Sequence, residues 1–294
     1  MKIILFLVNT HKDKYQLFVK AGRKLGIEVQ IHTYQEISIY FQEQNPSQPL
    51  LKIAGQNLTD FSLIYLRTLI KSPELQMLIS QSCKENNIPI MDPVFSYQEP
   101  FIDGKAFTYF KLVKHGLPII DTLMIINQNK TQIEQLKFPL IAKASSGSQG
   151  RDVYLCQNKE ELTTIVNKYS QPLLIEPFIK NDGDIRLTII GDRFIAAIKR
   201  TSQKDEFRNN TSLGGKAVAY QPSKTEIKIA IQATQVMNYV IAGVDLIYDQ
   251  SLKKWLIMEV NRAPQFTTLA PISGIDIPLE IIKYFKELIR KNIK

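Results

Sequence analysis

Two segments near the C-terminus place acidic and amide side chains inside otherwise apolar runs. Residues 243–247 read GVDLI and contain Asp245, and residues 255–261 read WLIMEVN and contain Glu259 and Asn261. If both segments are strands, the period of two places Glu259 and Asn261 on one face, with Asp245 opposite them in a hairpin. Two carboxylates and an amide oxygen are the hard ligands that Mg²⁺ prefers. In an isolated segment, polar strand ends with local hydrogen bonds explain the same residues.

A lysine and a small-residue turn form a second candidate site. Residues 142–150 read AKASSGSQG, with Lys143 at the end of a predicted strand and Gly147, Ser148 and Gly150 in the turn. Backbone N–H groups of such a turn approach phosphate oxygens closely, and a lysine adds a point charge. No Walker A motif is present. A plain surface loop remains an equal interpretation.

A third candidate follows a predicted strand hairpin. Residues 184–190 and 193–200 are its strands, and residues 207–210 after it read FRNN. Arg208 with Asn209 and Asn210 on a glycine-containing loop is suited to stabilise an oxyanion. An ordinary loop would read the same way.

The elements that must position these residues begin with alternating strands and helices. Apolar periodicity predicts strands at residues 2–8, 28–32, 63–67 and 88–91, and helices at 14–25 and 73–86. This alternation predicts an α/β domain with a parallel sheet. It carries no G-x-G-x-x-G turn after the first strand, so a dinucleotide site is unsupported.

The rest of the chain is predicted to form two lobes. Asp92-Pro93 breaks the pattern, so we expect domains at residues 1–92, 93–172 and 173–294. Predicted helices follow at residues 104–115, near 131–136, at 159–169, 223–243 and from 278 onward. Predicted strands are residues 122–126, 140–144, 153–155, 173–176, 184–190, 193–200 and 255–260. Gly116 is placed to end the helix before it.

Composition narrows the class of protein. The chain has 294 residues, 22% of them charged, and a net charge of +9. Its basic residues are scattered, so nucleic-acid binding is not favoured. The apolar N-terminus is too short for a signal peptide, and no run is long enough to cross a membrane. With two cysteines and no metal spacing, we expect a soluble, cytoplasmic protein with reduced thiols.

Taken in order, these segments resemble the ATP-grasp superfamily, and within it the RimK-type ligases and the LysX-type amino-group carrier ligases. The resemblance covers roughly residues 100–282. It rests on DGK at residues 103–105, Lys143 with its loop, EPFI at 176–179, DIR at 184–186, FRNN at 207–210, GVD at 243–245, EVN at 259–261 and SGIDI at 273–277.

The resemblance implies an ATP-grasp fold, with two lobes clamping ATP behind an N-terminal α/β domain, and a role for each matching residue. The implied ATP contacts are Lys105, Lys143, Gly147, Ser148, Gly150, Glu176, Pro177, Phe178, Ile179, Asp184, Arg208, Asn209 and Asn210. Arg208 would be catalytic, since it would offset the charge that develops during phosphoryl transfer. Asp245, Glu259 and Asn261 would bind Mg²⁺, or Mn²⁺, between the phosphates.

The implied reaction is ATP-dependent amide formation. A carboxylate would be activated as an acyl-phosphate and captured by an amine, that of an amino acid such as glutamate, with a protein, peptide or small molecule as acceptor. A small-molecule or natural-product peptide ligase and an inactive nucleotide-binding regulatory module are the alternatives. A homo-oligomer is compatible with the sequence.

Two departures from the family pattern lie in the glycine-rich loop and in the segment after Asn261, where the resemblance places the acceptor. Gly150 is followed by Arg151 where many members have a second glycine, and Asn261 is followed by Arg262. Arg262 is a candidate contact for a substrate carboxylate, and a solvent-exposed charge is the alternative. Arg67 ends a predicted strand. It is either a residue that faces the cleft or a surface cation, and the surface cation is the favoured interpretation.

Overall fold

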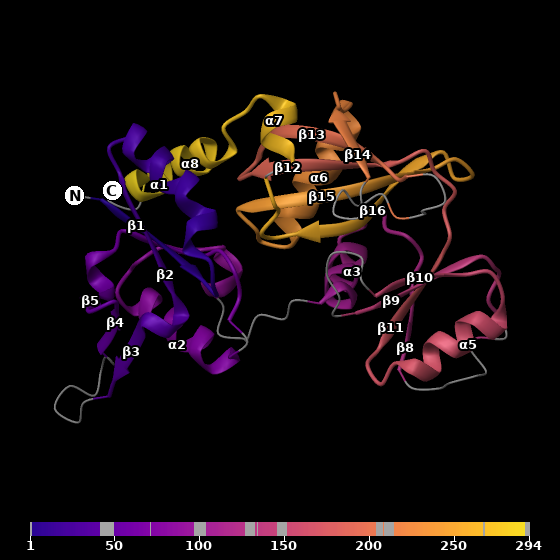
Figure 1. The fold of residues 1–294 in the computed structure, drawn as a ribbon, viewed down its shortest axis with the longest axis horizontal. Helices are drawn as coiled ribbons and strands as arrows, with labels where there is room; N and C mark the ends of the chain where they lie inside the picture. The colour runs from indigo at the N-terminus through magenta and orange to yellow at the C-terminus, as the bar shows by residue number, and fades with distance from the viewer. Residues whose placement is uncertain are drawn as a thin grey trace.

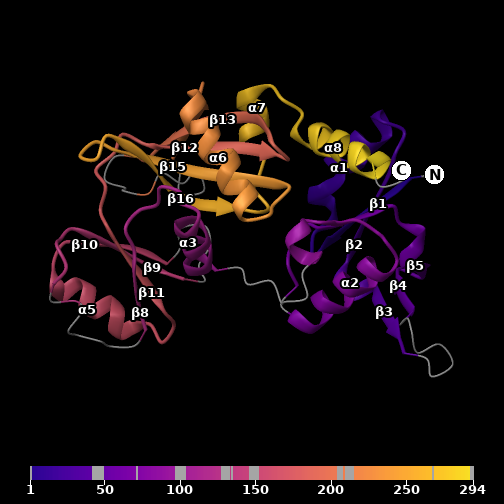
Figure 2. The same ribbon diagram turned by 180° about the vertical axis from the view of Figure 1, so that it is seen from behind.

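The computed structural model describes residues 2–41, 50–70, 72–96, 104–126, 133, 135–145, 152–203, 208, 215–266 and 268–291. These residues form a mixed α/β structure in three parts (Figure 1). An N-terminal domain lies at one end, and two lobes lie at the other with helix α3 between them (Figure 2). The predicted fold class is confirmed.

The N-terminal domain is built on a parallel sheet with strand order β2-β1-β6-β7. The apolar run of β1 lies at its centre, and Ile4 to Val8 are fully buried, which is why this strand has no alternation. Pro73 opens α2, and the Ser72 side chain accepts a hydrogen bond from the Leu75 amide as a cap. The elements are β1 (Ile3–Val8), α1 (Gln16–Lys24), β2 (Glu28–Thr33), β6 (Leu63–Leu66), α2 (Pro73–Glu85) and β7 (Ile90–Met91).

Two features of this domain were not predicted. A small antiparallel sheet is formed by β3 (Ile37–Tyr40), β4 (Leu50–Ile53) and β5 (Gln56–Asn57). The C-terminal helix α8 (Ile277–Lys291), assigned from sequence to the last lobe, packs beside α1 (Figure 1). Its Phe285 ring lies 5.3 Å from the Tyr65 ring. The predicted domain boundaries themselves stay predictions.

The central lobe is an antiparallel sheet with strand order β10-β9-β11-β8, covered by helix α5. Asn158 caps α5 by accepting from the Glu161 amide. Gly116 adopts φ 69° just after α3, as predicted for a helix stop. The elements are α3 (Lys105–Lys114), β8 (Leu123–Ile125), β9 (Leu140–Ala144), β10 (Val153–Cys156), α5 (Lys159–Lys168) and β11 (Leu173–Pro177).

The C-terminal lobe is an antiparallel sheet with strand order β14-β13-β12-β15-β16. One face is apolar, and α6 packs on it through Ala230, Ala233 and Met237. Charged side chains of β12, β13, β15 and β16 lie on the opposite face. The elements are β12 (Asp184–Ile190), β13 (Arg193–Thr201), β14 (Lys216–Ala219), α6 (Lys224–Val236), β15 (Ile241–Asp249), β16 (Lys254–Asn261) and α7 (Leu269–Ser273).

The predicted helix at residues 223–243 is wrong at its C-terminal end. The helix ends at Val236, Asn238 turns the chain with φ 55°, and β15 begins at Ile241. Residues 241–247 are buried in the middle of the sheet, so pairing with both neighbouring strands overrides the helical pattern. The helix predicted near residues 131–136 lies largely outside the described residues. None of the described helices is long and apolar enough to cross a membrane.

Candidate active site

Asp245 and Glu259 stand directly opposite each other on neighbouring strands. The β15–β16 register pairs Asp245 with Glu259 and Gly243 with Asn261. Asn261 Nδ2 donates to Glu259 Oε2 at 3.1 Å, so both side chains lie on one face of β16. The predicted placement of the three polar residues on facing strands is therefore confirmed. Their role as metal ligands stays a prediction.

Lys105, at the first turn of α3, faces this acidic group. Its Nζ lies 3.6 Å from Glu259 Oε1, and its backbone N–H donates to the Ser145 carbonyl oxygen at 3.3 Å. The sequence separates Lys105 from Glu259 by a whole lobe, and the fold brings them together. Both line a cavity of about 420 Å³, with Arg67, Asn261 and Arg262 also in its wall.

Asp245 belongs to a cluster of four charged side chains, two positive and two negative, here called the balanced cluster: Asp184, Arg186, Arg200 and Asp245. All are buried except Arg186, which is half-buried. Arg186 donates to both Asp245 oxygens, at 2.5 and 2.6 Å. Arg200 donates to both Asp184 oxygens, at 2.6 and 2.9 Å, and also lies 3.0 Å from Asp245. Burial opposes the charge on Asp245, but the two arginines outweigh it and hold its pKa below the ordinary value.

Lys143 is held by a carboxylate and a tyrosine. Its Nζ lies 2.6 Å from Glu176 Oε1 and 2.8 Å from the Tyr109 hydroxyl, and all three side chains are buried. The Tyr109 hydroxyl donates to the Met258 carbonyl oxygen at 2.6 Å. Burial and the Glu176 carboxylate raise the pKa of Tyr109 well above its ordinary value, so the hydroxyl keeps its proton. Tyr109 thus ties the lysine of the central lobe to β16.

The predicted hinge lies at the end of β11. Pro177 is exposed, and Phe178 and Ile179 are half-buried. The Phe178 N–H donates to the Pro139 carbonyl oxygen at 3.0 Å, and the Ile179 carbonyl accepts from Asn181 at 2.8 Å. These backbone groups bond within the protein in this structure, and their contact with an adenine ring stays a prediction.

Two arginines lie where the N-terminal domain meets the C-terminal lobe. Arg262 is 7% exposed, so the alternative of a solvent-exposed charge is wrong. It donates to the Leu66 carbonyl at 2.6 Å and lies 3.3 Å from Asp92. Arg67 is 6% exposed, so the predicted surface cation is also wrong. The reason is that β6 ends beside the loop after β16, where the Arg67 side chain donates to the Pro264 carbonyl oxygen and faces the Phe266 ring.

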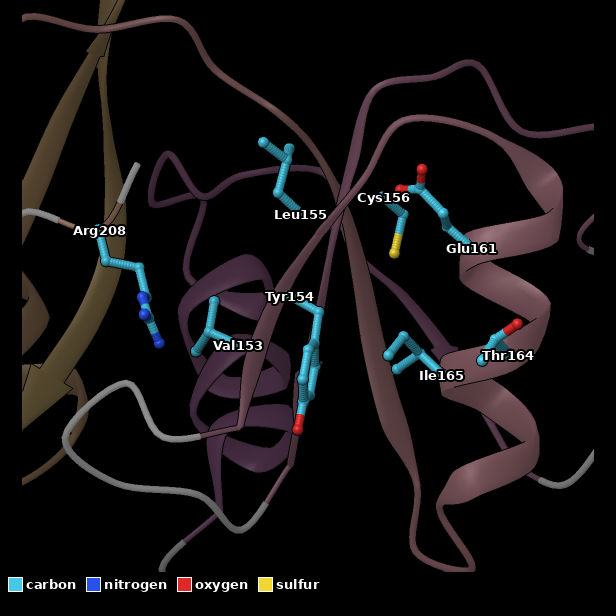
Figure 3. A pocket seen from close by; sticks show the side chains of 8 residues that line it. All are labelled: Val153, Tyr154, Leu155, Cys156, Glu161, Thr164, Ile165 and Arg208. Carbon is cyan, nitrogen blue, oxygen red and sulfur yellow. The ribbon is translucent and has the colours of Figure 1, made fainter. Parts of the chain in front are cut away.

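Arg208 lies at a different pocket. It lines a hollow of about 480 Å³ over β10 and α5, with Val153, Tyr154 and Glu161. Figure 3 shows its side chain beside Val153, on the side away from α5. Arg208 is not among the residues lining the cavity of Lys105, and its catalytic role stays a prediction. Gly147, Ser148, Gly150, Asn209 and Asn210 lie outside the described residues.

The donor set fits a magnesium ion chemically. The described residues include no group of three or more His, Cys, Asp or Glu side chains poised for a metal. The predicted set has two carboxylates and an amide, and phosphate and water oxygens normally complete a magnesium shell. Glu259 is 35% exposed toward the cavity, and the Asn261 amide oxygen is an acceptor beside it. These residues can therefore take a hard cation together with an anionic ligand.

Several residues of the site were not assigned from sequence. The sequence pattern could have revealed Arg186 and Arg200, because a charged residue inside an otherwise apolar strand is rarely buried without a partner of opposite charge. No such pattern marks Tyr109, since it occupies an ordinary apolar helix position. Arg67 was noticed and wrongly placed at the surface.

The chain is similar to known proteins in both sequence and fold. Residues 103–285 match the RimK-like ATP-grasp domain. A probable alpha-L-glutamate ligase of Mannheimia succiniciproducens is 36% identical, covering 98% of this chain and 99% of its own. The ATP-grasp ligase PsnB, solved with minimal precursor, Mg and ADP, has a TM-score of 0.74 at 17% identity over 99% of this chain and 97% of its own. The ATP complex of D-alanine–D-alanine ligase from Bacillus anthracis has a TM-score of 0.69 at 16% identity, covering 99% and 98%.

Proposed function

We propose a substrate class for this chain, which belongs to the RimK-like ATP-grasp family and is an ATP-dependent amide-forming ligase. The enzyme couples the amine of an amino acid to a carboxylate of a protein or peptide acceptor, and glutamate is the first candidate for the amino acid. The observation that carries the proposal is the meeting of Lys105, Glu259 and Asn261 at one cavity, with Asp245 beside Glu259. Glutamate is supported by the name of the relatives, probable alpha-L-glutamate ligase.

In this proposal the lysines and the acidic group divide the work of holding ATP. Lys105 and Lys143 contact phosphate oxygens, and Asp245, Glu259 and Asn261 hold Mg²⁺, or Mn²⁺ in its place. A bound divalent cation neutralises charge on the phosphates. The residues at 176–179 flank the adenine, and Asp184 supports the nucleotide side through Arg200, to which it is paired.

The reaction follows from these positions. A carboxylate oxygen of the acceptor attacks the γ-phosphorus in line, the bond to the bridging oxygen breaks, and ADP leaves. The amine nitrogen then attacks the acyl carbon, inorganic phosphate leaves with the electrons of the C–O bond, and the nitrogen loses a proton. Lys105 offsets the charge on the transferring group. Arg208 takes the same role in this proposal only if its side chain leaves the pocket over β10 and α5. The turn containing Gly147, Ser148 and Gly150 is proposed to cover the acyl-phosphate and exclude water.

The cell compartment is part of the proposal. Cys83 and Cys156 are both unpaired and buried, which suits a reducing cytoplasm. Burial raises the pKa of the Cys83 thiol to about 12 and that of Cys156 to about 11, so neither is a ready nucleophile. The two thiols therefore give no support to a thioester intermediate in the proposed reaction.

The test is ADP release with Mg-ATP and a panel of amino acids, with cell extract as the source of acceptor. Release should depend on glutamate and should fall about 10²- to 10³-fold in Glu259→Ala, the size expected when a charge stabiliser is lost. Glu287→Ala is the matched control, because Glu287 is an exposed glutamate on α8. No amino-acid dependence, with ATP still raising the melting temperature, would favour a regulatory module instead. Activity recovered only in the small-molecule fraction of the extract would favour a small-molecule ligase.

A further inference from the structure

A second buried group of charges lies at the carboxyl edge of the N-terminal parallel sheet. Arg67 directly follows β6, and Asp92 directly follows β7. Arg262 reaches this edge from the end of β16 and donates to the Leu66 and Arg67 carbonyl oxygens at 2.6 and 3.3 Å. Arg67, Asp92 and Arg262 are here called the cationic cluster. Ligands of open parallel sheets bind at this edge.

The charges of the cationic cluster do not balance. Arg262 pairs with Asp92 at 3.3 Å. Arg67 makes no ion pair with any carboxylate among the described residues, and its NH2 donates only to the neutral Pro264 carbonyl oxygen, at 2.7 Å. Two arginines and one aspartate therefore leave one positive charge without a counter-charge among the described residues.

Arg67 also carries unsatisfied hydrogen-bond donors. Its Nε and NH1 are buried and make no hydrogen bond of good geometry among the described residues, and the same holds for the Tyr65 hydroxyl. The Tyr65 hydroxyl lies close enough to the Arg67 guanidinium to interact with it, but it carries no charge that offsets that of Arg67. A buried donor left unpaired destabilises a fold, and a buried cation does so more strongly. Such groups in native structures call for an explanation, such as a catalytic role or an ordered water or ion that completes the bonding.

The cavity supplies the route for such a ligand. Arg67 and Arg262 line the same cavity as Lys105, Glu259 and Asn261. Arg262 fixes the backbone of Arg67 through its carbonyl, and the Phe266 ring lies 5.3 Å from the Arg67 guanidinium. Arg67 is thus held in position at the N-terminal wall, while the proposed phosphate contacts Lys105 and Lys143 belong to α3 and β9.

We propose that Arg67 binds a carboxylate of the amino-acid substrate, with Arg262 as its positioning residue. The inference rests on the proposed function, because that function places an amino acid in this cavity. A carboxylate supplies the missing counter-charge and accepts from the guanidinium, which pairs with planar oxyanions. The phosphates of ATP lie with the lysines, so Arg67 distinguishes amino acids that present an anionic group here from those that do not.

The test is a double-mutant cycle between the enzyme and its substrate. Steady-state kinetics of wild type and Arg67→Gln are measured with glutamate, with its α-carboxamide, and with glutamine, whose side-chain carboxylate is replaced. We expect Arg67→Gln to raise the KM for glutamate roughly 10- to 100-fold and that for ATP less than about twofold. In the wild type, one of the two amide analogues should have a KM higher than that of glutamate by a similar factor. Arg67→Gln should raise the KM for that analogue almost no further.

Controls separate this inference from its premise. Arg193→Gln removes one positive charge from an exposed position on β13 and should leave every KM unchanged. Arg67→Lys keeps the charge and should recover part of the affinity for glutamate. The comparison of glutamate with its amide analogues in the wild type can be made even if a variant fails to fold. Wild type with no amino-acid-dependent ADP release overturns the proposed function. Two outcomes in an active wild type overturn the assignment of Arg67 alone. In the first, Arg67→Gln raises the KM for both amide analogues by as large a factor as it raises the KM for glutamate. In the second, Arg67→Gln raises the KM for ATP instead of that for glutamate.

Discussion

The balanced cluster on the C-terminal sheet and the cationic cluster at the domain junction each hold two arginines, of which Arg186 is half-buried and Arg67, Arg200 and Arg262 are buried. In the first, every guanidinium meets a carboxylate within 3.0 Å. In the second, the single carboxylate of Asp92 faces Arg262 at 3.3 Å, and Arg67 bonds to a carbonyl oxygen. Burial alone is therefore not the feature that separates structural arginines from ligand-binding ones.

The difference follows from the cost of moving charge out of water. Burying an ion is unfavourable unless a partner and hydrogen bonds offset the lost hydration. The balanced cluster offsets it internally, so its arginines orient Asp245 and stabilise the lobe. The cationic cluster leaves the offset to a molecule from the cavity. Comparing the numbers of positive and negative side chains in each cluster thus separates the structural cluster from the ligand-binding one.

The largest expected effect is on the balanced cluster. Replacing Arg200 by Met removes the bidentate partner of Asp184 and one contact of Asp245. Two buried aspartates then share one arginine, and we expect the free energy of unfolding to fall by about 3–5 kcal/mol. Urea denaturation followed by circular dichroism measures this. A loss below about 1 kcal/mol would remove the distinction between the two clusters.

A smaller loss is expected from the carboxylate of the cationic cluster. Asp92→Asn leaves Arg67 and Arg262 buried with no counter-charge, although the amide oxygen retains the hydrogen bond from the Val240 N–H. We expect a loss of roughly 2–3 kcal/mol, at or below the low end for breaking a buried pair. Added glutamate should restore part of it in a thermal melt. A variant as stable as wild type would show that Asp92 is already neutral in the fold.

Removing the unpaired arginine should change stability least among the buried groups. Arg67→Met deletes the excess charge and fills the space with an apolar chain, so we expect a change within about 1 kcal/mol of either sign. Melting curves of Arg67→Met and Arg200→Met under one condition give the comparison directly. Equal losses in the two variants would mean that Arg67 is a structural residue like Arg200.

A partly exposed ion cluster in the N-terminal domain gives the smallest expected effect, against which the two arginine clusters can be compared. Glu36 contacts Lys12, Thr33 and His32. Burial opposes its charge, yet these partners lower its pKa from 4.5 to about 2. A lowered folded pKa gives stability that is present above the unfolded value and disappears as the pH falls through about 2.

Glu36→Gln should therefore cost less than about 1 kcal/mol at pH 7, because solvent screens the cluster. The gap between wild type and variant should close between pH 4.5 and about 2, as measured by urea denaturation at a series of pH values. A gap that is constant across this range would mean that the side chain acts through packing.

The sequence by itself determined the parts of this protein whose signals are local. The buried run of β1, the Pro73 start of α2, the Gly116 stop and the alternation of Glu259 and Asn261 follow from backbone geometry and side-chain burial. The ordered motifs also predicted the family, because several short motifs in one order are far more specific than any one of them.

Only the tertiary structure decided where the helix before β15 ends, since pairing with both neighbouring strands competes with helical periodicity at Ile241. It likewise decided that α8 leaves its lobe to cover the N-terminal domain. Above all, it decided which arginines are buried together. Arg67 and Arg262 are nearly two hundred residues apart, and a charge imbalance between them exists only once the two domains close on one cavity.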